Sequence, residues 1–373
     1  MKRERAILII DSARNADLVY GSNFIVGDPV IFIDRGDKKF LVLNDLEVDR
    51  GKKDSSVDEV ISISKYTEKL NSTEDKMFQI VTLVLDDLNI KKIEVSDSFG
   101  AFYYKKLVDN GYDISIIRGS NYPSRIVKTE EQKNKIKYVM SELDRALRKV
   151  TSILSEATIE GEFIKYKGEF LTSEYIKEVI NIELLRKNIF SESIIIASGK
   201  QTVDPHNVGS GRLYANTPII MDIFPRSHDS LYFGDQTRTF LKGKATEEQK
   251  KLYNTVFEGQ KLGIEMLKEG VNGMDIHNSI MDYFNSQGFE TGLIDGRMQG
   301  FFHGTGHGVG LEIHEAPRIS GNIDAIMKEG YVVTIEPGLY YKDLGGVRIE
   351  DTLWVTKDGY ENLSISDKFF EIE

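Results

Sequence analysis

Four acidic residues in the second half of the chain interrupt segments that otherwise have the pattern of buried β-strands. Asp222 follows the apolar run IIM and Asp235 follows YFG, while Glu336 lies within YVVTIEPGLYY and Glu350 within GVRIEDTLWV. Burying a carboxylate without a partner is costly, because the charge loses its water. Any fold that buries these strands must therefore bring positive charge to the four carboxylates.

The first two acidic residues lie in the segment IIMDIFPRSHDSLYFGDQTRTF, which predicts a β-hairpin around the polar turn 227–230. If the hairpin folds about its centre, Asp222 and Asp235 are equidistant from the turn and lie opposite one another on one face. Facing carboxylates repel unless a cation lies between them, which favours a metal site. A solvated hairpin with ordinary acidic residues is the alternative.

Glu336 and Glu350 repeat this arrangement. Their strands are connected through residues 342–346, so the two side chains can converge from neighbouring strands. Glutamate in such an apolar run needs a partner. A metal ion is one candidate, and a buried ion pair with Arg348 is the other.

All six histidines lie between His206 and His314, and the first 200 residues contain none. Three of them fall within twelve residues of the segment FFHGTGHGVGLEIHEAPR. Glycines at positions 304, 306, 308 and 310 remove side chains around His303 and His307, which allows backbone and substrate to approach closely. A merely flexible glycine-rich loop does not explain these histidines.

Charge counting indicates what such a site could hold. Four carboxylates carry −4 and a neutral imidazole adds nothing, so two divalent cations balance the sum. The chain has no cysteine, which leaves oxygen and imidazole nitrogen as ligands. Such ligands suit Mn²⁺, Co²⁺, Fe²⁺ or Zn²⁺, and two such ions roughly 3.5 Å apart can bridge and ionise a water.

The pattern along the chain predicts two domains. In residues 1–123, strand-like runs at 6–10, 29–33, 39–43, 91–95 and 113–117 alternate with helical segments such as 73–88, which predicts an α/β domain. A Gly, Ser, Asn and Pro cluster at 118–123 predicts a linker. Residues 124–373 are predicted to form an α+β domain, with a capping box at Thr129 and Gln132, a helix to about Ser155 and helices at 247–267 and 274–287.

Composition narrows the possible partners and compartment. A net charge of −11 in 373 residues repels phosphate backbones and anionic lipids, so we expect no nucleic-acid or membrane partner. The opening apolar run, Ala6 to Ile10, is too short for a signal sequence, and no stretch approaches the roughly 18 apolar residues of a membrane span. Together with the absence of cysteine, this favours the cytoplasm.

These residues resemble the metallopeptidases of the pita-bread fold, peptidase family M24, which include methionine aminopeptidase, aminopeptidase P and prolidase. The matched elements are Asp222, Gly-Asp-x-Thr-Arg-Thr-Phe around Asp235, His-Gly-x-Gly-His-Gly-x-Gly-Leu-x-x-His-Glu-x-Pro from His303, Ile-Glu-Pro-Gly at Glu336 and Arg-Ile-Glu-Asp-Thr at Glu350. The resemblance implies a creatinase-like N-terminal α/β domain followed by a pita-bread catalytic domain.

The resemblance also implies a metal-binding role for each of five residues. Asp222 would chelate one ion, His307 and Glu336 the other, and Asp235 and Glu350 would bridge both. Mn²⁺ or Co²⁺ is the expected metal, and Zn²⁺ or Fe²⁺ also fits. A homodimer is implied as well.

Further residues take catalytic and substrate-binding roles by the same resemblance. Glu336 would shuttle a proton to the leaving nitrogen, and His314 and His206 would contact the substrate and assist catalysis. His303 and Arg348 are candidate substrate contacts, with a structural role open for His303.

Arg318 bears on the choice of substrate. After His-Glu-x-Pro, an arginine is expected to hold the carboxylate of a terminal proline, which favours an Xaa-Pro dipeptidase (prolidase). Aminopeptidase P, which acts on longer Xaa-Pro peptides, is the alternative. The substrates would be proline-containing di- or oligopeptides.

The sequence departs from the family in one place. Asp222 and Asp235 are thirteen positions apart, two more than expected, and Phe224-Pro225-Arg226 replaces a short glycine-containing segment. This predicts a longer hairpin and leaves the shape of the pocket rim open. Family members without metal, such as creatine amidinohydrolase, or without catalysis would lack metal ligands, whereas all five positions are filled here.

Overall fold

The chain folds into two compact units, Met1–Arg125 and Ile126–Glu373. The computed structural model describes residues 3–70, 72 and 74–373. The predicted domain boundary, between residues 123 and 124, lies two residues before this division.

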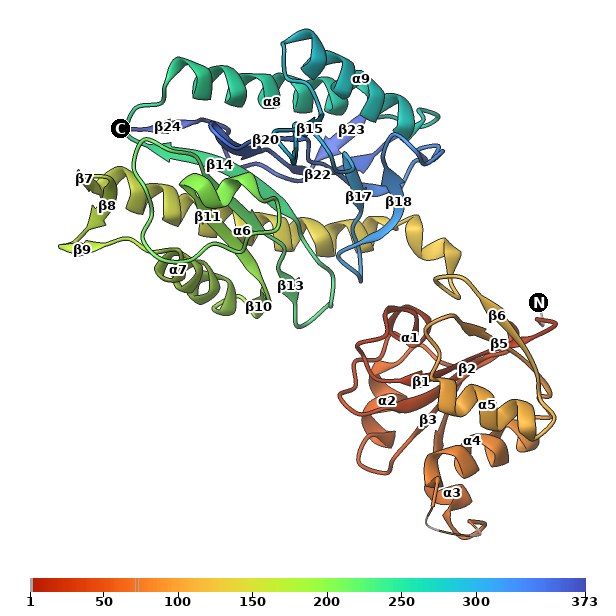
Figure 1. Ribbon diagram of the computed structural model, residues 1–373. Coiled ribbons are helices and arrows are strands. Elements are labelled where there is room, and N and C mark those ends of the chain that lie inside the picture. Colours follow the sequence, from red (N-terminus) through yellow and green to blue (C-terminus); the bar gives the residue numbers. More distant parts are fainter. Residues whose placement is uncertain (1–2, 71, 73) are drawn as a thin grey trace. The chain divides into compact units, whose positions relative to one another are not determined.

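The first unit is a six-stranded sheet in the order β4-β3-β2-β1-β5-β6 with helices on both faces (Figure 1). Alternate residues of its first strand enter different cores: Ile7 and Ile9 pack with helix α1, whereas Ala6 and Leu8 pack with helices α4 and α5. The elements are β1 (Ala6–Asp11), α1 (Ala16–Ser22), β2 (Val30–Asp34), β3 (Lys39–Leu43), α2 (Val48–Asp54), β4 (Glu59–Ser62), α3 (Ser64–Thr67), α4 (Lys76–Asp87), β5 (Lys92–Ser96), α5 (Ala101–Asp109), β6 (Asp113–Ile117) and the 3₁₀ turn η1 (Pro123–Ile126). All five predicted strands are present.

One prediction for the first unit is partly wrong, and another falls on a residue outside the described part of the chain. The predicted linker at 118–123 is partly wrong, because Asn121 and Tyr122 are buried within the unit. The Asn121 backbone N–H donates to Asp17, and the Tyr122 hydroxyl donates to Asp34 at 2.8 Å. Thr73, the predicted start of a helix, lies outside the described residues, and α4 begins at Lys76.

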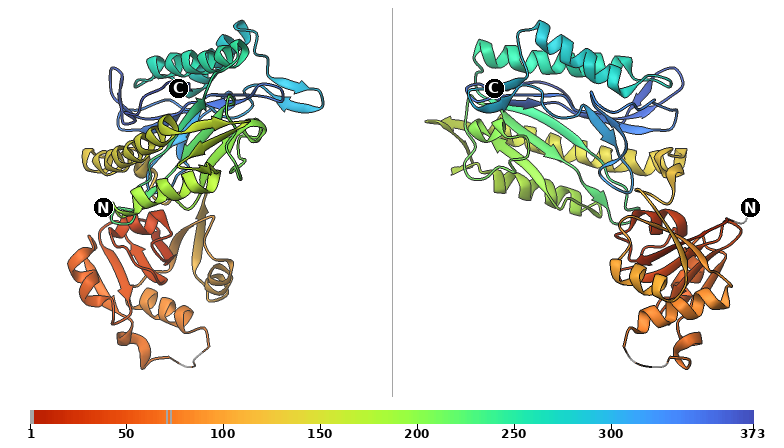
Figure 2. Two further views of the ribbon diagram at one scale, coloured as in Figure 1. Left: turned by 90° about the vertical axis from the view of Figure 1, so that its left-hand side faces the viewer. Right: turned by 45° about the vertical axis from the view of Figure 1, so that its right-hand side comes forward.

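The second unit places β-sheets between two pairs of helices, with α6 and α7 on one side and α8 and α9 on the other (Figures 1 and 2). The two main sheets have the orders β11-β12-β14-β24 and β18-β17-β19-β22-β23. The helices are α6 (Glu130–Glu156), α7 (Ser173–Leu185), α8 (Glu247–Met266), α9 (Gly273–Ser286) and the 3₁₀ turn η2 (Gly199–Val203). The strands are β7 (Thr158–Glu160), β8 (Phe163–Tyr166), β9 (Glu169–Phe170), β10 (Ile189–Phe190), β11 (Ile194–Ser198), β12 (Ile219–Ile223), β13 (Arg226–Ser227), β14 (Gln236–Lys242), β15 (Gly292–Ile294), β16 (Arg297–Gln299), β17 (Gly306–Gly308), β18 (Glu315–Ile319), β19 (Val332–Ile335), β20 (Gly338–Tyr341), β21 (Gly345–Arg348), β22 (Asp351–Val355), β23 (Tyr360–Asn362) and β24 (Glu371–Ile372).

The helices of the second unit follow from local sequence signals. Helix α6 begins at the predicted capping box, in which the Thr129 side chain accepts from the Gln132 backbone and the Gln132 side chain accepts from the Thr129 backbone. Helices α8 and α9 begin and end within one residue of their predicted bounds. Helix α7 was not predicted, although Thr172 caps its first turn. No helix in the described part of the chain is both long and apolar enough to cross a membrane.

A buried ionic network lies between β14, β22 and the C-terminal segment. Arg238 is 1% exposed and donates to Asp351 Oδ1 at 2.9 Å and to the Glu350 carbonyl at 2.6 Å. Lys368 forms a second ion pair with Asp351, which is fully buried. Although burial alone would raise it, these two cations hold the pKa of Asp351 below its ordinary value.

We predict that Arg238→Met lowers the free energy of unfolding by about 3–5 kcal/mol, because it removes one partner of a buried ion pair. Urea unfolding followed by circular dichroism measures this change. The exposed Arg148 of α6 provides the matched control, and Arg148→Met should stay within about 0.5 kcal/mol of the natural protein. Equal stability of the two variants would contradict the assigned role of the network.

Candidate metal centre

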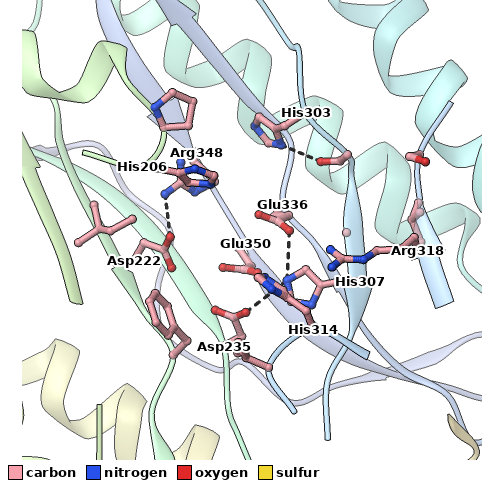
Figure 3. A pocket seen from close by; sticks show the side chains of 18 of the residues that line it. His206, Asp222, Asp235, His303, His307, His314, Arg318, Glu336, Arg348 and Glu350 are labelled. Carbon is pink, nitrogen blue, oxygen red and sulfur yellow. Dashed lines mark hydrogen bonds and ion pairs between the residues drawn. The ribbon is translucent and has the colours of Figure 1, made fainter. Parts of the chain in front are cut away.

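The second unit contains a cavity of about 880 Å³. All ten residues that the sequence singled out for metal, substrate or catalysis line it (Figure 3). They are His206, Asp222, Asp235, His303, His307, His314, Arg318, Glu336, Arg348 and Glu350.

The two aspartates reach the cavity from the hairpin formed by β12 and β14. Asp222 pairs with Thr237, so the prediction that Asp222 lies directly opposite Asp235 is wrong. The turn is centred one residue later than assumed, because Ser227 bonds through its backbone to Leu231 and to Tyr232. Strand side chains alternate, so this two-residue offset still leaves both aspartates on one face of the hairpin.

The two glutamates lie where one long hairpin is interrupted. Strands β19 and β22 pair up to Ile335 and Asp351, and strands β20 and β21 resume at Gly338 and Arg348. Glu336 and the fully buried Glu350 fall in the gap between the two ladders and face the same cavity, as the sequence predicted. The Thr237 hydroxyl donates to Glu350 Oε2 at 2.8 Å and joins the two hairpins.

Arg348 does not pair with either glutamate. Its guanidinium donates to Asp222 Oδ2 at 2.8 Å and to the Tyr340 hydroxyl at 2.6 Å. The alternative of a Glu–Arg348 ion pair is therefore wrong. The Arg348 side chain extends across to Asp222 on β12 instead. One carboxylate of the cavity is thus already compensated by a protein cation.

His307 lies between the two hairpins. Its Nε2 is 3.4 Å from Asp235 Oδ2 and 3.3 Å from Glu336 Oε1. Its Nδ1 is 3.2 Å from the Gly308 carbonyl, a contact that needs the proton on Nδ1 and leaves the Nε2 lone pair facing the carboxylates. A Cβ on Gly306 would overlap the Thr334 carbonyl, so this glycine is required for the strands to pack around His307.

The electrostatics of the cavity call for a cation. Burial, followed by the neighbouring carboxylates, raises the pKa values of Asp235 and Glu350 well above their ordinary range. Burial also raises the pKa of Glu336 to about 7, against the opposing effect of Arg348. The pKa of His307 is lowered to about 3, first by burial and then by His314, so its imidazole is neutral.

The donor set fits divalent metal ions. Asp235, His307 and Glu350 each offer a ligand atom within 4.8 Å of the others, and Glu336 and Asp222 line the same cavity. Carboxylate oxygens with one neutral imidazole are suitable ligands for the ions named above. Cation binding would also relieve the repulsion that raises the carboxylate pKa values.

The remaining predicted residues lie around these carboxylates. Arg318 on β18 is the cross-strand partner of His307 on β17, and the ring of His314 is perpendicular to that of His307 at 4.5 Å. Asp222 and Arg318 lie on opposite sides of the group formed by His307, Glu336 and Glu350 (Figure 3). His206 follows η2, and its backbone N–H donates to the Asp204 side chain.

Sequence reasoning did not single out Tyr340, whose hydroxyl lies between Arg348 and His303. This hydroxyl is 3.2 Å from His303 Nε2, while His303 Nδ1 is 2.7 Å from the Gly304 carbonyl. Both ring nitrogens of His303 are thus engaged within the protein, which favours a structural role. The only available signal for Tyr340 was its place in the same apolar run as Glu336.

We predict that Mn²⁺ binds metal-free protein at least about tenfold more weakly at pH 6 than at pH 8, because Glu336, with a pKa of about 7, holds a proton at pH 6 that binding must release. Calorimetric titration in two buffers of different ionisation enthalpy measures both affinity and proton release. Glu336→Gln should release fewer protons, whereas the exposed Glu329→Gln should behave as the natural protein. Binding that strengthens as the pH falls would contradict this assignment.

Comparisons with known proteins show the family and the fold of this chain. The model of metallopeptidase family M24 matches residues 134–357. An uncharacterized peptidase of Methanocaldococcus jannaschii is 37% identical over 265 residues, which cover 70% of this chain and 69% of that protein. The Xaa-Pro dipeptidase of Pyrococcus furiosus is 30% identical over 352 residues, covering 92% and 89%.

A solved structure shows the same fold over both units. The X-Pro aminopeptidase from Thermotoga maritima superposes with a TM-score of 0.79 at 22% identity, covering 99% of this chain and 97% of that one. The predicted α/β unit followed by a pita-bread catalytic unit is thereby confirmed. The chain belongs to metallopeptidase family M24 and is a metallopeptidase.

Proposed function

We propose that this metallopeptidase hydrolyses the bond before proline and acts as an Xaa-Pro dipeptidase. The observation that carries the proposal is the position of Arg318, which lines the cavity directly across the strand from His307. Within the described ranges, no carboxylate forms an ion pair with its exposed guanidinium. The carboxylate of a dipeptide would form an ion pair with this guanidinium, at a distance from the scissile bond that the length of the dipeptide fixes. The relative from Pyrococcus furiosus is named as an Xaa-Pro dipeptidase, which supports the assignment.

The proposal includes two divalent cations, with Mn²⁺ or Co²⁺ favoured. Asp222 would hold one, His307 and Glu336 the other, and Asp235 and Glu350 both. Such a pair supplies an ionised water at neutral pH and polarises the carbonyl of the scissile bond. A cytoplasmic location and a homodimeric state stay predictions from the sequence.

The protein groups around this site have complementary roles in the proposal. Glu336, with a pKa of about 7, can take a proton from water and pass it to the leaving nitrogen. His314 can donate a hydrogen bond to the developing oxyanion, and burial, followed by Arg318, lowers its pKa and keeps it neutral. His206 lines the same cavity and would contact the substrate.

Aminopeptidase P activity is the second candidate. The cavity volume of about 880 Å³ lies in the upper part of the range of roughly 300–1,000 Å³ typical of small-ligand sites. A peptide longer than two residues could therefore enter. The fold shared with an X-Pro aminopeptidase is compatible with either activity.

We predict that protein stripped of metal and reloaded with Mn²⁺ releases methionine from Met-Pro faster than from Met-Pro-Ala, because only the dipeptide places its carboxylate within reach of Arg318. Chromatographic detection of free methionine measures both reactions. Cleavage of the tripeptide alone would reassign the chain to aminopeptidase P. Cleavage of neither would refute proline specificity and leave the metal centre to be tested by binding.

We predict that Arg318→Ala lowers kcat/KM for Met-Pro by about 10- to 100-fold, the scale of losing a hydrogen bond to a charged group. Met-Pro-Ala should lose much less. Arg318→Lys should recover part of the loss, since lysine keeps the charge without the bidentate geometry. The surface variant Arg148→Ala is the control. An equal loss on both peptides would show that Arg318 does not recognise the carboxylate of the dipeptide.

A further inference from the structure

Phe224 lies beside the metal centre and faces the cavity. It follows β12 directly, two residues after Asp222, so both side chains lie on the same face of the strand. Its neighbours Ile223 and Pro225 are buried, whereas Phe224 is half-buried. The Gly234 backbone N–H donates to the Pro225 carbonyl, which continues the hairpin past Phe224 and fixes its backbone.

A second apolar residue adjoins the same aspartate from the neighbouring strand. Ile195 on β11 is the cross-strand partner of Asp222 and also lines the cavity. Directly paired residues of an antiparallel ladder point to the same face. Phe224 and Ile195 therefore flank Asp222. Val208, whose carbonyl accepts from the Ile196 backbone N–H, lines the cavity beside β11.

The position of Arg318 orients a dipeptide with respect to the cavity wall that these apolar residues form. Asp222 and Arg318 lie on opposite sides of the site, with His307, Glu336 and Glu350 between them (Figure 3). Because the proposed function places the carboxylate of a dipeptide at Arg318, its amino end extends across the metal centre to the opposite side, where Asp222 lies (Figure 3). The side chain of its first residue then lies against the wall that carries Phe224.

The chemistry of this wall determines which side chain is favoured at the first position of the dipeptide. Ile195, Val208 and Phe224 offer apolar surface, and Asp222 beside them is already paired with Arg348. An apolar side chain would remove the half-buried Phe224 ring further from water, whereas an acidic one would lose its own water against this apolar surface.

We infer that Phe224 is a specificity-determining residue whose ring supports the side chain before the scissile bond and thereby favours apolar over acidic or absent side chains. This inference rests on the proposed function, because it takes the orientation of the dipeptide from Arg318. It adds a preference for the first side chain of the dipeptide and assigns that preference to Phe224.

The test compares kcat/KM for Met-Pro, Gly-Pro and Asp-Pro in the Mn²⁺-loaded natural protein and in Phe224→Ala. Met-Pro should be the best of the three substrates and Asp-Pro the poorest. Phe224→Ala should lower the value for Met-Pro by about 10-fold and that for Gly-Pro by less than about threefold, the scale on which an apolar pocket discriminates a few methylene groups. The first residue of Gly-Pro has no side chain that could contact the ring.

Two further variants separate recognition from folding. Phe224→Leu keeps an apolar side chain and should retain most of the Met-Pro preference, so it also carries the test if Phe224→Ala does not fold. Phe102→Ala removes a 48% exposed ring from α5 in the first unit and should leave the Met-Pro to Gly-Pro ratio unchanged. Thermal unfolding and metal content establish that each variant is folded and loaded.

The outcomes distinguish this inference from the proposed function. Equal losses on Met-Pro and Gly-Pro, or faster cleavage of Met-Pro by Phe224→Ala, would overturn the inference while leaving Xaa-Pro hydrolysis intact. If the natural protein cleaves Met-Ala and Gly-Ala but no Xaa-Pro peptide, proline specificity fails, and the Met to Gly ratio in the alanine series still decides the role of Phe224. Cleavage of none of these peptides would overturn both.

Discussion

Electrostatic repulsion within one cavity is the constraint around which the second unit is built. Asp235, Glu336 and Glu350 all have raised pKa values there, with burial as the largest cause. Arg348 forms an ion pair with Asp222 alone, and these four carboxylates with this guanidinium would carry 1 − 4 = −3 if all were ionised. A fold selected for stability alone would not gather these groups. Their concentration is an energetic strain that protonation or a cationic ligand relieves, which is typical of functional sites.

The parts of the site that the sequence predicted are those set by local chain geometry. Alternation along a strand and the connection of a hairpin determine which side chains share a face, and these suffice to bring Glu336 together with Glu350. The same reasoning gave the face of Asp222 and Asp235 correctly and their register wrongly. Register depends on which residue closes the turn, and the backbone bonds of Ser227 do not follow from composition.

The parts that the sequence did not predict depend on contacts between distant segments. The apolar pattern around Arg348 contains nothing that selects Asp222, 126 positions away, over Glu350 as its partner. Tyr340 is indistinguishable in the pattern from a core aromatic residue until its hydroxyl is placed beside His303. The Arg238 network likewise needs a lysine from the C-terminal segment. Such side-chain geometry is decided by packing, which local periodicity does not encode.

The interruption of the β19–β22 ladder at Glu336 and Glu350 has a consequence for the order of assembly. Each acidic pair belongs to a hairpin with a short connection, so its two members meet at a small loss of chain entropy. The two hairpins are separated by about a hundred residues, and contacts of such sequence separation form slowly. The repulsion between the aspartate pair and the glutamate pair therefore arises only at the step at which the hairpins dock. Each half of the centre contributes only one acidic pair, and the full set of cation ligands exists only when the halves meet.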